Sequence, residues 1–576
     1  MTKFDTKYQV YYLVKSDGKT KVTFVVTQKN NFSIVYATEY GISLNQTKID
    51  NLKITDDGQP VTNPTIVNSQ NQTIISFPFA KKVAGKDKVR TFSIEYETDE
   101  IVNHQGNTWQ INIPRFESDE TISEQTAILS LPEDFPKPGY VDPKPDIVNN
   151  NTYYFSSKIM ANKPISLIFG DSQYYQLSVS YVLENNQSAT TKKSITLIPD
   201  TAYQTVNYQS IDPKPLSVTE DNDGNLLAWY DLKPNETVEI LTSLLVKTSF
   251  VPYQFNQSTG SNYLEKNDIW NFDSPSFTSP EIKNLTTPKS IYDYVTNKLS
   301  YDYQKIDLTG TIRQPASEVL KNPLSAICTD FTDLFISLSR RAGIPSRELE
   351  GIALSDNQNL KPISSKLDLL HAWPEYFDND KKVWIQVDPT WANTTRGQDY
   401  FNKLDFNHIV FAIHGTTPLE PVPAGGFKGS KKDTKQVIAQ INPKVDFQIS
   451  KPSLELSSKN INQAQLTITN EGGTYIYGQL KVSEDKYLHP FESQISIPPY
   501  GKKEILLKTK MFSMFDPDND KSIIFINEEK YDIKTKQHQS YSPFVLAAGS
   551  IFLGFVTLTA RSLLFRRRKQ KTHIHR

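Results

Sequence analysis

Short runs of alternating apolar and polar residues fill most of this 576-residue chain. They are rich in Val, Ile, Thr, Tyr and Phe, and they recur across residues 1–172, 173–255 and 445–535. An alternation of period two is typical of half-buried strands, and the Gly, Asn and Asp residues between the runs mark turns. The pattern therefore predicts an N-terminal β domain, a second β domain and a third all-β domain near the C-terminus.

Residues 268–416 follow a different pattern. Apolar residues recur there at helical spacing over residues 290–299 and 326–347, and strands are predicted from His371 onward. Gly343, which an Ile-Pro pair follows, is a typical signal for the end of the second helix. The sequence thus predicts one α+β module among β domains.

The stretch after this module, residues 417–444, is rich in Pro, Gly and Lys and is interpreted as a linker. The β domain that follows it, residues 445–535, resembles an immunoglobulin-like sandwich in its patterning but has no disulfide signature. The predicted fold class is therefore a multidomain, mostly β protein with β-sandwich domains on both sides of one α+β module.

A long apolar run near the C-terminus predicts a single transmembrane helix over residues 543–565. The basic tail 566–576 follows it directly, which predicts a cytoplasmic C-terminus and an extracytoplasmic body by the positive-inside rule. The first residues show no charged segment followed by a continuous apolar segment, so no export signal is visible. Two interpretations stay open. We favour a start downstream of a removed or misannotated signal, and the other is a tail-anchored protein with a cytoplasmic body.

Composition narrows the classes of function. Of 63 basic and 64 acidic residues, seven basic ones and no acidic one lie in residues 541–576, which leaves a formal charge of −8 on the rest of the chain. An acidic body with a basic tail beside an apolar segment argues against a nucleic-acid partner and indicates a lipid bilayer instead. Cys328 is the only cysteine, which excludes an intrachain disulfide and Cys-based zinc or iron–sulfur sites. No metal and no other cofactor is predicted.

Cys328 is predicted to lie in the first turn of the helix in residues 326–347, with Ser325 as its N-cap. Unpaired backbone N–H groups and the positive end of the helix dipole favour a thiolate at such a position. The Cys328 backbone N–H could also donate a hydrogen bond to an oxyanion, whereas no second donor is evident. The competing interpretation is a buried cysteine that acts as a small apolar residue.

His371 and Asp388 lie on either side of a predicted hairpin whose turn is residues 378–381. If the loop has two or four residues, His371 faces Asp388 across the two strands and the carboxylate can hold the imidazole ring. A loop of odd length would put the two side chains on opposite faces of the sheet. Taken singly, His371 is also compatible with an ordinary strand histidine and Asp388 with a turn residue before a proline.

Three further residues are candidates near this hairpin. Trp373 and Trp391 flank it and are candidate substrate-binding residues, although core packing explains two tryptophans equally well. His408 could approach the same site from the last strand of the module.

The cysteine, the histidine and the aspartate carry a resemblance to the transglutaminase-like superfamily. The residues that carry it are CTDF at 328–331, RAGIPSR at 341–347, HAW at 371–373 and DPT at 388–390. The resemblance implies a papain-like core with Cys328 as nucleophile, His371 as base and Asp388 as the residue that orients the histidine. Two features depart from the family. The glycine often found just before its cysteine is absent, and no Trp lies just upstream to match the oxyanion-side tryptophan of animal transglutaminases.

Together these features predict a membrane-anchored, extracytoplasmic thiol enzyme that acts on protein glutamine or peptide amide bonds through a thioester. The two upstream β domains are similar to those beside such modules in bacterial and archaeal envelope proteins, which implies protein or peptide substrates at the cell envelope. An amine would resolve the thioester by transamidation, and water would resolve it by proteolysis or deamidation. The alternatives are a cysteine peptidase of the same fold, a non-catalytic cell-surface binding or scaffold protein, and an adhesin with a reactive thiol.

Overall fold

The computed structural model describes the chain from residue 2 to residue 536 with gaps. The gaps are residues 70–71, 107, 115–119, 136, 161–163, 254–260, 306–312, 356–369, 396–397, 430–434, 443–446, 461, 486 and 511–520. The predicted transmembrane helix 543–565 and the tail 566–576 lie outside the described residues. Within the described part, no helix is both long enough and apolar enough to cross a bilayer. The chain divides into two compact units, Met1–Ile449 and Ser450–Arg576.

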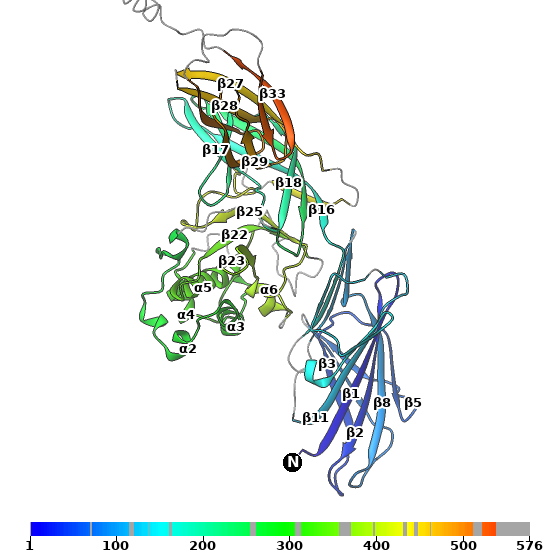
Figure 1. Cartoon of the computed structure of the whole chain (residues 1–576). Coiled ribbons are helices and arrows are strands. Elements are labelled where there is room, and N and C mark those ends of the chain that lie inside the picture. Colours follow the sequence, from blue (N-terminus) through cyan, green and yellow to red (C-terminus); the bar gives the residue numbers. More distant parts are fainter. Residues whose placement is uncertain are drawn as a thin grey trace, which may run out of the picture. The chain divides into compact units, whose positions relative to one another are not determined.

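The N-terminal part of the first unit is the predicted β domain (Figure 1). Side chains alternate between buried and accessible along its long strands, as the period of two in the sequence predicts. The eight strands of its largest sheet are, in spatial order, β13 (Ile147–Asn149), β14 (Thr152–Phe155), β11 (Ile122–Ser130), β1 (Phe4–Val14), β2 (Thr20–Asn30), β8 (Val89–Thr98), β4 (Asp50–Asp56) and β5 (Gln59–Pro60).

Two smaller sheets and a short helix complete this domain. The four-stranded sheet has the order β12 (Tyr140–Asp142), β15 (Ile165–Phe169), β10 (Thr108–Ile113), β9 (Val102–Gln105). The three-stranded sheet has the order β3 (Glu39–Leu44), β7 (Thr73–Pro78), β6 (Thr65–Asn68), and the helix is α1 (Ser157–Met160). One apolar core, which includes Phe24, Phe92 and Ile111, receives side chains from all three sheets.

The second β domain contains two sheets. The first has the order β18 (Gln204–Asp212), β21 (Thr237–Thr248), β16 (Gln173–Glu184), β26 (Val437–Ile441), and the second has the order β17 (Thr191–Leu197), β20 (Leu226–Leu232), β19 (Ser217–Glu220). Strand β26 falls inside the stretch 417–444 that the sequence predicts to be a linker. It pairs antiparallel with β16, so this part of the stretch is a strand of the second β domain. The sequence did not predict this strand, because its five residues are too few to show an alternation of apolar and polar positions.

The α+β module combines a four-stranded sheet with short helices (Figure 1, green to yellow). The sheet order is β24 (Val383–Gln386), β23 (His371–Asp378), β22 (Ser346–Ala353), β25 (His408–His414). The helices are η1 (Ser261–Leu264), η2 (Pro275–Phe277), α2 (Pro280–Lys283), α3 (Pro288–Lys298), α4 (Ala316–Lys321), α5 (Cys328–Arg341) and α6 (Pro389–Thr394). Helix α5 packs against β22 and β23 and also against α3, α4 and α6.

The ends of α5 show what the sequence predicts correctly and what it does not. Gly343 has a φ of +78°, and the Ile344 N–H donates to the Ser339 carbonyl, which closes the helix as predicted. The helix is shorter than the predicted stretch 326–347, because the chain enters β22 at Ser346.

Strand β25 lies at an edge of the module's sheet, and the second β domain covers it. The Gln204 side-chain amide accepts from the Val410 N–H and donates to the Val410 carbonyl. Asn225, which lies in the turn between β19 and β20, makes the same pair of hydrogen bonds with Ile413. Each amide thus pairs with the backbone as a neighbouring strand would. The N–H and carbonyl groups of Val410 and Ile413 on this edge therefore have hydrogen-bond partners.

The second unit is all-β in its described residues. Its seven strands have the order β30 (Phe491–Ile497), β29 (Ile476–Val482), β32 (Lys521–Ile526), β33 (Glu529–Lys536), β27 (Pro452–Asn460), β28 (Gln463–Asn470), β31 (Lys502–Lys508). A separate apolar core, which includes Leu466, Leu480 and Ile524, fills it. The mostly β, multidomain fold class with one α+β module is confirmed, while the immunoglobulin-like topology stays a prediction.

Candidate active site

Cys328 is the first residue of α5, as the sequence predicts, and its side chain is half-buried. The predicted cap is wrong, because the Ser325 hydroxyl donates to Asp302 (2.7 Å) and the N-cap residue is Ile327. The Asp330 carboxylate, at the third position of the helix, accepts from the N–H of the N-cap residue Ile327 (2.9 Å), as in one half of a capping box. The Cys328 N–H has no acceptor among the described residues. It is therefore available to an oxyanion formed beside the sulfur.

The imidazole of His371 and the carboxylate of Asp388 meet, with 2.9 Å between Nε2 and Oδ2. They do not meet across the hairpin as predicted. In the observed register Tyr376 faces Ile385, two residues out of step with the prediction, and β24 ends at Gln386. Asp388 is instead the N-cap of α6, where its Oδ1 accepts from two backbone N–H groups. The contact between His371 and Asp388 was therefore predicted correctly, but it is made from the N-cap of α6 and not across the two strands.

The hydrogen bond of Nε2 defines the roles of the two nitrogens of His371. Because Asp388 only accepts, His371 must donate from Nε2, which leaves Nδ1 for the thiol. His371 and Asp388 are buried, with 4% and 0% of their surface exposed, whereas Cys328 is more accessible. The sulfur is thus the member of the group that a substrate can reach.

Burial and charge oppose each other at this pair. Burial alone would lower the pKa of His371, but the Asp388 carboxylate, together with a smaller effect of Cys328, raises it to about 9. Burial likewise would raise the pKa of Asp388, but His371 and His408 hold it well below its usual value. At neutral pH the pair is an imidazolium and a carboxylate, which puts a positive charge next to the sulfur.

The family comparison agrees with this geometry. Residues 274–389, which include Cys328, His371 and Asp388, match the family model described as the transglutaminase-like superfamily. The chain contains a transglutaminase-like superfamily domain. No curated protein matches the sequence.

Several solved structures are similar to parts of the chain. One is a candidate cysteine protease from Cytophaga hutchinsonii, with 15% identity over 47% of this chain and 87% of that one and a TM-score of 0.28. The periplasmic domain of TgpA from Pseudomonas aeruginosa matches at 12% identity, over 40% of this chain and 97% of that one, with a TM-score of 0.23. Red sea bream transglutaminase matches at 10% identity, over 58% and 75%, with a TM-score of 0.18. Because these TM-scores are low, the domain assignment rests on the family model and the site.

Two tryptophans of the transglutaminase-like domain enclose the histidine. The rings of Trp373 and Trp391 lie 5.7 and 5.4 Å from the His371 ring and nearly parallel to it. Both indoles are fully buried. In this conformation they fix the plane of the imidazole, and the substrate-binding role considered for them stays a prediction.

Tyr301 is a residue that the sequence interpretation missed. Its backbone forms a parallel bridge with Ala326, two residues before Cys328. Burial and the nearby Cys328 raise the pKa of the Tyr301 phenol well above its usual value, so the hydroxyl stays protonated. The hydrophobic pattern held no signal for it, because only the bridge brings residues 301 and 326 together.

His408 lies against the same carboxylate, with 3.2 Å between its Nε2 and the Asp388 Oδ2. Its Nδ1 lies 2.8 Å from an oxygen of Asp405, a second residue that the sequence interpretation missed. An Asp three residues before a candidate His is a spacing that could have drawn attention to it. The nitrogens of His371 and His408 and the oxygen of Asp388 lie within 4.8 Å of one another, so this group could hold a metal ion. Each nitrogen is already used in a buried hydrogen bond to the carboxylate, which accounts for the cluster without an ion.

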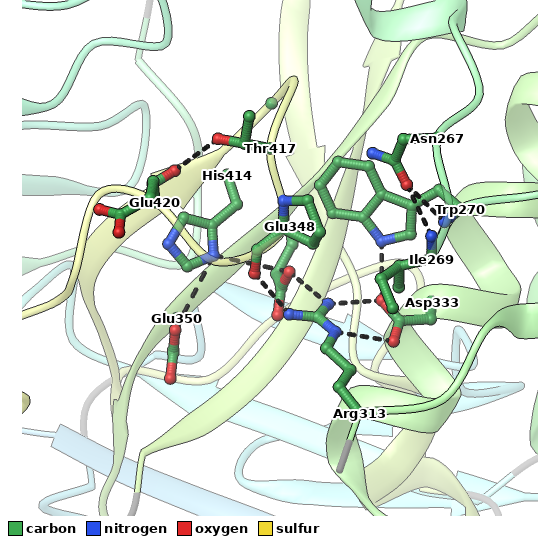
Figure 2. A network of polar contacts seen from close by, with 12 residues as sticks. Asn267, Ile269, Trp270, Arg313, Asp333, Glu348, Glu350, His414, Thr417 and Glu420 are labelled. Carbon is green, nitrogen blue, oxygen red and sulfur yellow. Dashed lines mark hydrogen bonds and ion pairs between the residues drawn. The ribbon is translucent and has the colours of Figure 1, made fainter.

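A second buried polar network contacts α5 at Asp333 (Figure 2). Arg313 donates from Nε to Asp333 of α5 (3.0 Å) and from Nη2 to Glu348 of β22 (2.6 Å). The Trp270 indole N–H donates to the same Asp333 (2.7 Å), and His414 lies 3.5 Å from Glu348. The network ties the helix that carries Cys328 to the strand that pairs with the start of β23, where His371 lies.

Proposed function

We propose that this protein is a thiol acyl-transfer enzyme, with Cys328 as the nucleophile, His371 as the acid–base residue and Asp388 as the residue that orients the histidine. The observation that carries the proposal is the buried His371–Asp388 hydrogen bond beside the cysteine at the start of α5. A buried ion pair of this kind has no structural need for an accessible thiol next to it. The presence of all three groups therefore argues against a non-catalytic scaffold.

In the proposed reaction, the Cys328 sulfur attacks the carbon of a glutamine carboxamide or a peptide amide. The resulting oxyanion accepts a hydrogen bond from the Cys328 N–H. The C–N bond then breaks as His371 gives its Nδ1 proton to the leaving nitrogen, and a thioester remains. An amine or a water molecule attacks the thioester, loses its proton to His371 and releases the thiolate. The choice between amine and water separates a transferase from a peptidase or deamidase.

The location is part of the proposal. The apolar run at 543–565 and the basic residues after it support a single membrane span with a cytoplasmic C-terminus. The enzyme would then act on proteins or peptides outside the cytoplasm.

The test of the proposed function uses an amine dye and a glutamine-bearing protein, with the products analysed by mass. We expect the wild-type protein to form a product, and dye incorporation identifies a transferase while chain cleavage or a one-dalton gain identifies a hydrolase. Labelling by a thiol-reactive probe supplies the matching evidence for the site. Because Cys328 is the only cysteine, the label reports on that residue alone. Labelling that His371→Ala does not slow, together with no product, contradicts the proposal.

The pH dependence of the reaction follows from His371. Its pKa of about 9 lies above the ordinary value of 6.5, so the proton needed by the leaving nitrogen is present at neutral pH and is lost as the pH rises through about 9. We expect the initial rate of ammonia release from a glutamine-bearing peptide to fall over that range. A rate that stays constant to pH 10 would show that His371 is not the proton donor.

A further inference from the structure

The candidate active site holds one more charged group than a cysteine, histidine and aspartate require. Oδ2 of Asp388 lies within hydrogen-bonding distance of two imidazoles, 2.9 Å from His371 and 3.2 Å from His408. The other oxygen, Oδ1, accepts from the N–H groups of Thr390 and Trp391. Four donors therefore converge on this one buried carboxylate.

The hydrogen bonds of His408 determine its protonation. Nε2 faces the Asp388 oxygen, and Nδ1 faces the Asp405 oxygen at 2.8 Å. Ionised carboxylates only accept hydrogen bonds, so both nitrogens of His408 must carry protons. His408 is a buried cation between two anions, and none of its side chain is exposed to solvent.

The fold places His408 beside Asp388 through a close approach of two strands. His408 is the first residue of β25 and pairs with Ala353 of β22, next to an irregularity at Gly351. A side chain at Gly351 would lie 2.0 Å from the Ile409 carbonyl oxygen, so only glycine allows β25 to approach here. The rings of Trp373 and Trp391, which also enclose His371, lie 4.9 and 4.5 Å from the His408 ring.

We propose that His408, held by Asp405, is a positioning residue of this site: its hydrogen bond to Oδ2 keeps the Asp388 carboxylate turned toward His371. The inference rests on the proposed function, because it concerns how the acid–base residue is held. His408 does not touch the substrate. It acts through Asp388: His408 orients the carboxylate, and the carboxylate in turn orients His371.

The positive charge of His408 has an effect of its own on His371. The two rings lie 5.6 Å apart and share one carboxylate. The positive charge of each ring therefore lowers the pKa of the other ring. Groups that face this cluster from the packed elements are Asp405, Asp388, His371, Cys328 beside His371, and the phenols of Tyr292, Tyr301 and Tyr400. The pKa values of the three phenols are raised mainly by burial, so they stay neutral. Among the described residues, Asp388 and Asp405 are the carboxylates that contact the two imidazole rings.

The experiment compares two substitutions of His408 by the rate at which a thiol-reactive probe labels Cys328. Glutamine at this position keeps an N–H donor for Asp388 and removes the charge, whereas leucine removes both. We expect His408→Leu to slow labelling at neutral pH about tenfold, through the loss of one hydrogen bond to a charged group. His408→Gln should restore most of the rate. In that variant the pH at which labelling changes as His371 loses its proton should rise by roughly one pH unit, because a like charge is gone.

The matched control is His414→Gln, because His414 is buried at the other end of the same strand, also beside carboxylates, and does not contact Asp388. It should leave both the labelling rate and the pH at which that rate changes at their wild-type values. If His408→Leu does not fold, as judged by its thermal unfolding, the role of His408 is tested by the pH at which labelling changes in His408→Gln and Asp405→Asn. Asp405→Asn keeps an acceptor for the Nδ1 proton of His408 but removes an anion beside the two imidazolium rings, so it should lower the pH at which labelling changes.

Each outcome bears on one proposal. Wild-type labelling rates in folded His408→Leu, or an unmoved pH in His408→Gln and Asp405→Asn, overturn the role of His408 if His371→Ala still slows labelling. If His371→Ala itself leaves labelling unchanged, the proposed function fails and not the assignment of His408 alone.

Discussion

Replacing Cys328 by alanine will abolish product formation, with a loss of about 10⁴-fold or more, because no other residue of the chain can form the thioester. The stability of the protein should change little. The Cys328 side chain is half-buried at the first position of α5 and is not part of the apolar core, so its removal opens no core cavity. Product formation with the amine dye and the midpoint of thermal unfolding measure the two quantities separately.

Thr329→Ala is the matched control for this prediction. Thr329 follows Cys328 in the same turn of α5 and is also half-buried. The control should retain near wild-type turnover. Residual turnover above about 1% in Cys328→Ala would show that another group carries the reaction.

Replacing Arg313 by methionine will destabilise the transglutaminase-like domain by about 3–5 kcal/mol, the usual cost of leaving buried charges without a partner. Asp333 and Glu348 are fully buried, and Arg313 bonds to both (Figure 2). Burial already raises the pKa of Asp333 to about 6 despite the arginine. Thermal or urea unfolding followed by tryptophan fluorescence reports on the domain, because Trp270 donates to Asp333.

Two variants test this explanation. Lys289→Met removes a cation from an exposed pair with Asp293 on α3 and should leave stability close to wild type. Adding Asp333→Asn and Glu348→Gln to Arg313→Met removes the unpaired charges and should recover part of the loss. An Arg313→Met protein as stable as the Lys289→Met control would contradict the assignment.

Elements with a clear period could be predicted from the sequence. Helix α3 spans Pro288–Lys298 where 290–299 was predicted, and its Thr287–Ser290 capping box is a local arrangement. Helix α5 shows the limit of such patterns. Phe331, Leu334, Phe335 and Leu338 form the predicted apolar face, yet Thr332 and Ser337 are equally buried. The apolar face shares one core with residues of α3, α4 and α6, and α5 also packs against β22 and β23. No local pattern contains information about these contacts.

In the candidate site, too, local features were predicted from the sequence, whereas the way in which distant residues meet was not. The thiol at the start of a helix is a local feature and was predicted correctly. The contact between His371 and Asp388 was predicted through a register that the structure does not have, because the chain leaves β24 and caps α6 with Asp388. Residue type and order thus predicted which residues come together, and the turn that forms α6 determined the atoms through which His371 and Asp388 meet.

The sequence by itself determined a mostly β chain with one α+β module, and it identified Cys328, His371 and Asp388 as a set. Strand periods, helix signals and residue chemistry are encoded over a few neighbouring positions, so they can be read without a fold. The sequence also named His408 as a candidate. Only the tertiary structure decided that His408 contacts Asp388, that Asp405 and Tyr301 lie nearby and that the Arg313 network supports α5. These contacts join residues far apart in the chain, and the close strand approach at Gly351 and the packing of α5 on all sides bring them together.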